Sequence, residues 1–141
     1  MTTKSYFTID ELCASDTAKK YGIDNTPNPT IITRLQRLIN FLNPIRETWG
    51  SAIKVTSGYR CEKLNCFVGG SKTSSHTIGY GVDLIPLNGK MSEFKKFIVD
   101  YMKNKMFDQC IIEKSGKTEW IHIGLYNLKG QQRRMIFNIT K

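Results

Sequence analysis

Both histidines of the chain lie where a catalytic metal site would need them. His76 and Asp83 are close in sequence, and His122 lies far downstream. A catalytic Zn²⁺ commonly takes three protein ligands from histidine and carboxylate side chains and leaves its fourth tetrahedral position to water. The two imidazoles and Asp83 therefore predict a zinc site with one open position. Glu119, close to His122, is a candidate general base.

The spacing of these residues favours an enzyme site. Gly79 and Gly81 allow a sharp turn between His76 and Asp83, so that both side chains can reach one metal. His122 belongs to a segment that alternates like a strand. Two nearby ligands and one remote ligand are typical of a site built across a sheet, whereas structural zinc sites more often use cysteine. The alternative, two ordinary histidines in a loop and a strand, is weakened by the accompanying carboxylate.

The motif around these residues resembles that of a known enzyme family. Residues 74–83 read Ser-x-His-x-x-Gly-x-Gly-x-Asp, and Glu119-x-x-His122 follows with Trp120 beside it. This pattern resembles the zinc D-alanyl-D-alanine metallopeptidases, which include D-Ala-D-Ala carboxypeptidases, dipeptidases and phage murein endopeptidases. The similarity also covers residues 55–60, 64–65 and 68–71 and continues to residue 125, about half of the chain. Two positions depart from the family pattern: Gly81 replaces the more usual Ala, and Ile121 separates Trp120 from His122.

The resemblance implies a role for each of these side chains. It assigns zinc ligation to His76, Asp83 and His122, general-base catalysis to Glu119, and substrate or oxyanion binding to Arg60, with Ser74 and Trp120 also contacting substrate. Zinc polarises a scissile carbonyl and lowers the pKa of water, and a carboxylate nearby can accept the proton. A guanidinium is a permanently charged planar donor that suits a carboxylate or an oxyanion.

The choice of general base remains open between two carboxylates. Residues three apart on a regular strand point to opposite faces, so Glu119 and His122 meet at one metal only if the strand starts at Trp120 or contains a bulge. Glu113 is the second candidate, because the turn over residues 114–117 can place it beside the next strand. Its alternative role is that of a solvated carboxylate at a strand end.

Composition indicates one globular domain. The chain has 141 residues, of which 40% are hydrophobic, so we expect a single zinc peptidase domain over residues 1–141. The net charge of +9 suits an anionic partner such as nucleic acid, a membrane surface or a bacterial envelope polymer. Because Lys and Arg are spread along the chain, no specific nucleic-acid partner is expected. We also expect a monomer.

Cysteine usage and the amino terminus bear on the cellular location. The four cysteines show no Cys-x-x-Cys spacing, so free thiols are expected, although Cys61 and Cys66 can pair under oxidising conditions. Residues 1–10 lack the pattern of a signal peptide, and no segment is long enough to span a membrane. We therefore expect a cytoplasmic product that reaches the cell wall through lysis-linked release or as part of a virion.

The expected fold is α+β, a small, mostly antiparallel sheet flanked by helices, with zinc in a groove on the sheet; the resemblance implies the same fold. Helices are predicted over residues 7–20, with Thr8 as N-cap, over residues 31–49, ended by Gly50, and over residues 91–106, with Ser92 as N-cap. Residues 61–72 are expected to be irregular. Strands are predicted over residues 53–56, 82–86, 109–113 and 120–125, with an edge strand over 134–139.

These features lead to a functional hypothesis. We expect a zinc peptidase that hydrolyses the stem peptides or cross-bridges of peptidoglycan, as a D-Ala-D-Ala carboxypeptidase or a murein endopeptidase of phage endolysin type. The alternative is a non-catalytic virion component or zinc-binding module with the same fold. A nucleic-acid-binding domain is a third reading that rests on charge alone.

Overall fold

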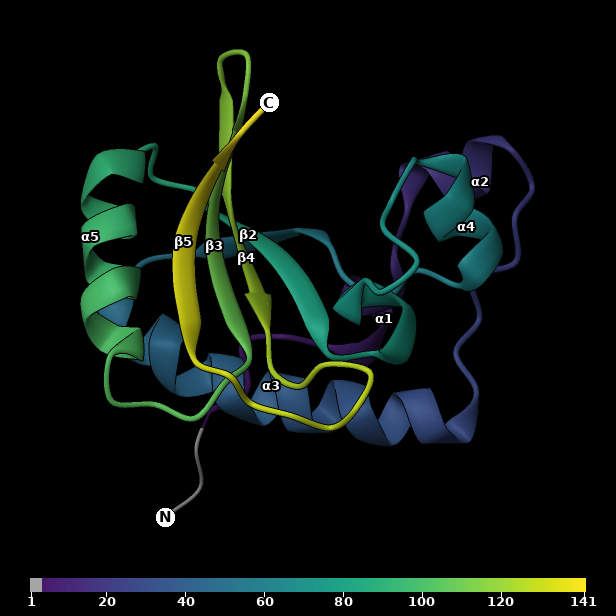
Figure 1. The fold of residues 1–141 in the computed structure, drawn as a ribbon, viewed down its shortest axis with the longest axis horizontal. Helices are drawn as coiled ribbons and strands as arrows, with labels where there is room; N and C mark the ends of the chain where they lie inside the picture. Colours follow the sequence, from purple (N-terminus) through teal and green to yellow (C-terminus); the bar gives the residue numbers. More distant parts are fainter. Residues whose placement is uncertain (1–3) are drawn as a thin grey trace.

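The computed structural model describes residues 4–141, and in it helices flank a five-stranded sheet (Figure 1). The strands are β1 (Ile53–Ser57), β2 (Gly81–Pro86), β3 (Gln109–Ser115), β4 (Thr118–Gly124) and β5 (Met135–Thr140), in the sheet order β1-β2-β4-β3-β5. The helices are α1 (Ile9–Cys13), α2 (Asp16–Lys20), α3 (Pro29–Trp49), α4 (Glu62–Phe67) and α5 (Met91–Met102), with a 3-10 helix, η1 (Ser75–Ile78), before β2. Neighbouring strands are antiparallel, except that β5 runs parallel to β3. The predicted α+β class and mostly antiparallel sheet are confirmed.

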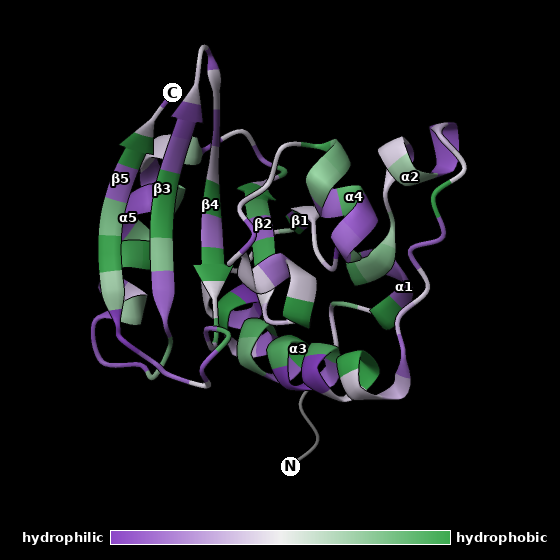
Figure 2. Cartoon of the chain, turned by 45° about the vertical axis from the view of Figure 1, so that its right-hand side comes forward, coloured by the Kyte–Doolittle hydropathy of each residue, from purple (hydrophilic) through white to green (hydrophobic). Residues whose placement is uncertain are grey.

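One face of the sheet is buried against helices, and the other carries the candidate metal ligands. Val82 and Leu84 of β2 flank Asp83, and all three pair with β4. Strand side chains alternate between the two faces, as the alternation of hydropathy along β2 and β4 shows (Figure 2). Val82 and Leu84 belong to the same buried core cluster as apolar side chains of α3 and α5: Leu35, Leu38, Phe94 and Ile98. Asp83 and its partner His122 therefore face the opposite side of the sheet.

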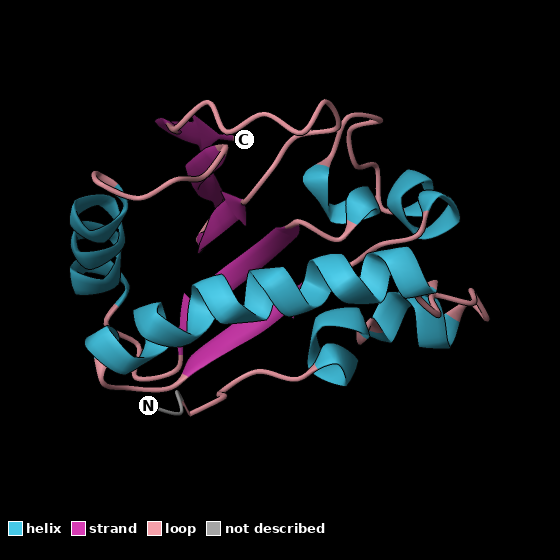
Figure 3. Cartoon of the chain, turned by 90° about the horizontal axis from the view of Figure 1, so that it is seen from below, coloured by secondary structure: helices cyan, strands magenta, loops and turns pink. Residues whose placement is uncertain are grey.

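Helix α3 is the longest element and supports the sheet from below (Figure 3). It starts where the Asn28 side chain accepts a hydrogen bond from the Ile31 amide, with Pro29 in the first turn. Pro44 lies inside the helix without ending it, and Gly50 at φ 80° provides the left-handed cap. The predicted end at Gly50 is confirmed, and the helix starts earlier than predicted because Asn28 and Pro29 supply starting signals.

The amino-terminal helix predicted over residues 7–20 is two short helices. Thr8 caps α1, as predicted, by accepting a hydrogen bond from the Glu11 amide. Ala14 is extended, and Ser15 caps α2 by accepting a hydrogen bond from the Ala18 amide. Because the Ser15 side chain can bond to the backbone and cap a new helix, the first helix ends before it. The segment is therefore divided into two helices.

Two further predictions about helices were wrong. Residues 61–72 were expected to be irregular, yet they contain α4, whose first turn is capped by the Cys61 sulfur accepting from the Leu64 amide. Helix α5 follows Lys90 without a side-chain cap, so Ser92 is not its N-cap, and the helix ends at Met102 instead of residue 106. The strands predicted over residues 109–113 and 120–125 pair as the antiparallel hairpin of β3 and β4, and the predicted edge strand is confirmed as β5.

Two further observations concern the cysteines and the lengths of the helices. Cys13, Cys61, Cys66 and Cys110 are free thiols. Among the helices formed by residues 4–141, none has the length and apolar character needed to cross a membrane.

Candidate metal centre

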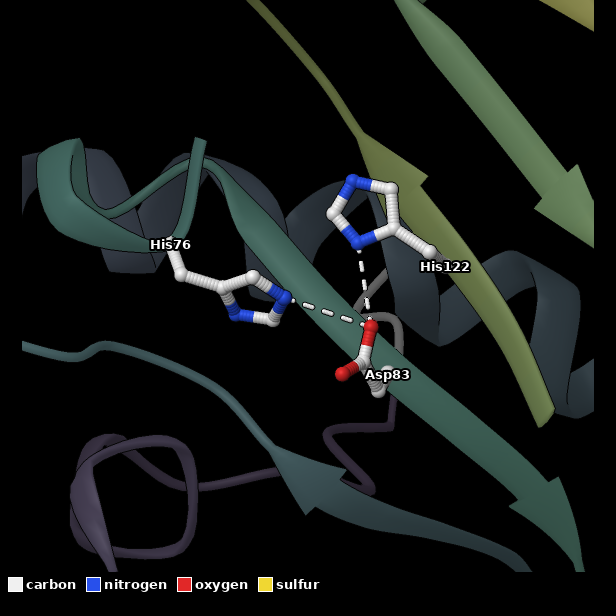
Figure 4. A group of neighbouring side chains, drawn as sticks. All are labelled: His76, Asp83 and His122. Atoms are coloured by element: carbon white, nitrogen blue, oxygen red, sulfur yellow. Dashed lines mark hydrogen bonds and ion pairs between the residues drawn. The ribbon is translucent and has the colours of Figure 1, made fainter. Parts of the chain in front are cut away.

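Three side chains meet on the open face of the sheet, as Figure 4 shows. His76 comes from η1, Asp83 from β2 and His122 from the neighbouring position of β4. Asp83 Oδ1 lies 3.2 Å from Nε2 of His76 and 3.0 Å from Nδ1 of His122. All three groups are buried, and their ligand atoms lie within 4.8 Å of one another. The structure thus brings together the three ligands that the sequence predicted.

These distances fit a tetrahedral zinc site. Zinc–ligand bonds of about 2.0–2.2 Å place the ligand atoms of a tetrahedron roughly 3.3 Å apart. The two measured separations from Asp83 Oδ1 are close to this value. Two histidines and one carboxylate also match the ligand set of a catalytic zinc site that leaves one position open.

The protonation of His76 gives a second argument for a cation. Nδ1 of His76 donates a hydrogen bond to the Gly58 carbonyl over 2.6 Å, so this nitrogen carries the proton. Burial lowers the pKa of His76 and favours the neutral ring, although the charge of Asp83 opposes this effect. Nε2 of a neutral ring with this tautomer presents a lone pair to the Asp83 carboxylate. A positive charge between these two groups, from a metal ion or from a proton on Nε2, would stabilise this arrangement.

The ring of His122 is positioned from both sides. Its Nδ1 faces Asp83, and its Nε2 lies 3.3 Å from the Ser75 hydroxyl. Burial tends to raise the pKa of Asp83, but positive charge and hydrogen-bond donation from the imidazoles, when they are protonated, outweigh burial and hold that pKa below its ordinary value. Asp83 is therefore ionised, as a metal ligand must be. Outer contacts such as those from Gly58 and Ser75 fix the orientation of metal-binding rings.

Arg60 extends into the same cavity and is held by two neighbours. Its Nε donates to Asn65 Oδ1 and its Nη1 donates to the Ser57 hydroxyl, each over 3.1 Å. Burial lowers the pKa of Arg60, and the charges of Asp83 and Glu113 oppose this shift. The guanidinium is thus held by Asn65 and Ser57 at the wall of the cavity, within reach of the charges of Asp83 and Glu113.

The two candidate bases lie on opposite faces of the sheet. Strand β4 is regular from residue 118 to residue 124, so Glu119 points away from His122. The ammonium of Lys95, on α5, lies 2.8 Å from the Glu119 carboxylate and holds its pKa below the ordinary value. Glu119 is not among the residues that line the cavity beside the metal ligands, and Glu113 is. The structure therefore does not bring Glu119 to the site.

Glu113 is held at the site by Trp120. The two residues are paired across β3 and β4, and the indole Nε1 donates to Glu113 Oε2 over 2.9 Å. Trp120 is two residues from His122 on the same strand, so both side chains point to the cavity. Oε1 of Glu113 lies 3.7 Å from the Lys141 ammonium. Trp120 thus positions a carboxylate in addition to lining the cavity.

The cavity is large enough for a peptide. Its volume is about 710 Å³, and Ser74, Arg60, Trp120 and the three metal ligands line it. The Ser74 hydroxyl accepts a hydrogen bond from the His76 amide, so Ser74 shapes η1 and also faces the cavity. Every site residue predicted from the sequence except Glu119 therefore lines one cavity.

Several supporting residues were not predicted. Asn65 and Ser57 hold Arg60, and Ser75 contacts His122. Asn65 and Ser57 lie inside the segments that carry the family resemblance, which was the available signal. No signal in the sequence pointed to Asp108 or Arg133, which also line the cavity.

Comparison with known proteins identifies the family. A search of curated proteins found no match. A family model described as Peptidase M15, a family of zinc-dependent metallopeptidases, matches residues 5–124, which include all three candidate ligands, Arg60 and Glu113. This match covers most of the chain, so the protein belongs to the peptidase M15 family.

Proposed function

We propose that this metallopeptidase hydrolyses the peptide part of peptidoglycan, in its stem peptides or its cross-bridges. The observation that carries the proposal is one cavity that holds the His76, Asp83 and His122 group together with Arg60 and Glu113. The resemblance to D-alanyl-D-alanine peptidases and murein endopeptidases supports this class of substrate. The net charge of +9 also suits an anionic cell wall.

We assign zinc to His76 Nε2, Asp83 Oδ1 and His122 Nδ1, because these atoms face one another and are fixed from behind. Zinc at this position supplies Lewis acidity, which polarises a carbonyl and lowers the pKa of water. The chain supplies a neutral imidazole at His76, an ionised Asp83 and a buried setting that strengthens their electrostatic interactions.

Glu113 is the general base in this proposal. Its carboxylate is held by the Trp120 indole on the face of the sheet that carries the metal ligands. In this position it can take a proton from the attacking water and later deliver it to the leaving amine. Glu119 pairs with Lys95 on the other face, which supports giving this role to Glu113.

Arg60 binds the substrate beside the scissile bond. Its partners Asn65 and Ser57 occupy Nε and one hydrogen of Nη1, and within residues 4–141 the other N–H groups have no hydrogen-bond partner. These donors suit a planar carboxylate or the developing oxyanion. A preference for peptides with a free carboxylate near the scissile bond follows.

The proposal is tested by digesting purified peptidoglycan with the zinc-loaded protein and identifying the products by mass spectrometry. New amino and carboxyl ends within the peptide are expected, and their masses identify the bond. Casein serves as a comparison substrate. Preferential cleavage of casein would make this a general protease, and no cleavage of either by the zinc-loaded protein would favour a non-catalytic module.

A further inference from the structure

The cavity has a wall that the family match does not cover. The match ends at residue 124, yet the segment over residues 125–141 contributes Arg133, Phe137, Ile139 and Lys141 to the lining. This part of the cavity therefore belongs to the carboxyl-terminal segment of this chain. It can distinguish substrates without altering the metal centre.

The sheet register shows how this wall continues from the metal centre. His122 pairs with Ile111, and Ile111 pairs with Phe137 on the edge strand β5. Directly paired residues lie on the same face of a sheet, so an apolar row extends from a metal ligand to the sheet edge. A second row joins Trp120, Glu113 and Ile139 in the same way. The floor of the cavity beyond Glu113 is thus made of Phe137 and Ile139.

Arg133 lies toward the opposite end of this wall from Ile139, beside Asp108, and has a fixed orientation. Its Nε and Nη2 donate to the two oxygens of Asp108 over 2.8 Å and 2.9 Å, and its own amide donates to Asp108 Oδ1 over 3.2 Å. Asp108 is only 2% exposed, whereas the Arg133 side chain is 44% exposed. A buried carboxylate therefore holds an accessible guanidinium in place.

The outer edge of this guanidinium remains available. Within the part of the chain that the structure describes, Nη1 of Arg133 makes no hydrogen bond, and Nη2 uses one of its two hydrogens. Lys129, on the same loop, also lines the cavity and adds positive charge. Parallel N–H donors on a fixed guanidinium suit a carboxylate better than a neutral amide.

We propose that the segment over residues 125–141 forms a second recognition site, where Arg133 binds a carboxylate of the peptide substrate away from the scissile bond and Phe137, between Arg133 and Ile139 along the chain, supports the adjoining apolar part. This inference rests on the proposed function, because it takes a peptide as the occupant. The expected substrate has two carboxylates, one near Arg60 and one near Arg133. Peptides whose second carboxylate is amidated bind more weakly.

The test compares two synthetic peptides, L-Ala-γ-D-Glu-L-Lys-D-Ala and the same peptide with the α-carboxylate of D-Glu amidated. Binding is measured by calorimetry on zinc-loaded Glu113→Gln protein, so that hydrolysis does not interfere. The acidic peptide is expected to bind about tenfold to a hundredfold more tightly, since a hydrogen bond to a charged group contributes about 1.5–3 kcal/mol. Arg133→Gln in this background should abolish the difference, and Arg133→Lys should reduce it.

Two controls keep the result interpretable. Lys117→Gln removes one positive charge at the hairpin turn, away from the cavity, and should retain the full preference. Because Arg133→Gln leaves Asp108 buried without its partner, the double variant Asp108→Asn/Arg133→Gln replaces the ion pair with neutral side chains of similar shape. Thermal unfolding monitored by circular dichroism identifies the variants that fold, and the preference must be absent from the folded double variant.

Equal affinity for the two peptides, failure of both to bind, or a preference that persists in the double variant would overturn the second site. Hydrolysis by the wild-type protein tests the proposed function separately. Equal affinity together with normal hydrolysis removes the second site and keeps the function. A preference that depends on Arg133 in a protein that does not cleave purified peptidoglycan keeps the second site and removes the function.

Discussion

The two histidines approach Asp83 through different ring nitrogens, and the reason lies in what each ring contacts on its other side. The Gly58 carbonyl accepts a hydrogen bond from Nδ1 of His76, which leaves Nε2 to face Asp83. Nε2 of His122 contacts the Ser75 hydroxyl, and Nδ1 faces Asp83. The geometry of the three ligands is therefore set by groups that do not touch the metal.

Replacing a ligand and replacing its support should have different effects. His122→Ala removes one of three ligands, so it should abolish stoichiometric zinc and all hydrolysis. Ser75→Ala keeps all ligands but frees the His122 ring, so zinc affinity should fall about tenfold to a hundredfold. Zinc content after dialysis and competition with a chromophoric chelator measure both effects. Full zinc occupancy in His122→Ala would refute the ligand assignment.

The two glutamates provide a matched pair of variants. Glu113→Gln removes the proposed base, so hydrolysis should fall by a factor on the order of 100 to 10,000 while zinc stays bound. Glu119→Gln makes the same change on the other face, where the carboxylate only pairs with Lys95. It should leave hydrolysis unchanged and cost less than about 1 kcal/mol of stability. Initial rates and urea unfolding provide the measurements, and the reverse order of rates would restore Glu119 as the base.

The sequence predicted the side chains at this site better than it predicted the direction in which each one points. His76, Asp83 and His122 are marked by residue type and spacing. The choice between Glu113 and Glu119 depends on where β4 starts, because moving along a strand by one residue exchanges its faces. The strand starts at Thr118, before Glu119, and no residue in the sequence indicated this boundary.

At the scale of elements, η1 and β2 pack unusually closely around Gly81. A Cβ atom at Gly81 would lie 2.5 Å from the Ser75 hydroxyl and 2.6 Å from the His76 amide. Members of the family more often have Ala at this position. Here the absence of a side chain at Gly81 allows η1 to lie closer to the strand. The close approach at Gly81 therefore involves both His76 and Ser75. Ser75 in turn positions His122.

Gly81→Ala should therefore displace η1 and weaken the metal site. Overpacking of this kind costs about 1–3 kcal/mol, and zinc affinity should fall because His76 moves with η1. Gly124→Ala is the matched control, since its Cβ would approach the Ser75 hydroxyl, a group that can rotate, at 3.1 Å and would lie at an ordinary contact distance of 3.5 Å from His122 Nε2 and Ser75 Cβ. Thermal unfolding and zinc competition should rank Gly81→Ala below Gly124→Ala. Equal effects would show that η1 adapts freely.

The helix that was not predicted from the sequence has a cap and contacts that depend on tertiary structure. Helix α4 is capped by the Cys61 sulfur, and cysteine is not among the usual capping residues. The Cys61 amide donates to the side chain of Asn25, which also bonds to the carbonyls of Cys13 and Tyr59. Such long-range support cannot be read from local periodicity, whereas the amphipathic helix α3 and the alternating hairpin strands can.

At the scale of the whole molecule, the positive charge and the cavity act over different distances. The net charge of +9 attracts an anionic polymer over the screening length of the solvent, about 30 Å in 0.01 M salt and about 3 Å in 1 M salt. The contacts expected of Arg60 and Arg133 form within hydrogen-bond distance and are partly shielded from solvent. Salt should therefore affect association with a charged cell wall more than binding of a small peptide.

Hydrolysis of intact cell-wall sacculi should fall severalfold as salt rises across this range, because long-range attraction increases the rate of association with an anionic surface. Hydrolysis of a soluble stem peptide by the same preparation should change much less. Parallel initial rates from turbidity and from product release make the comparison. Sacculi stripped of their anionic polymers provide the control and should lose most of the salt dependence. A similar dependence for sacculi and soluble peptide would mean that the net charge plays no part in reaching the wall.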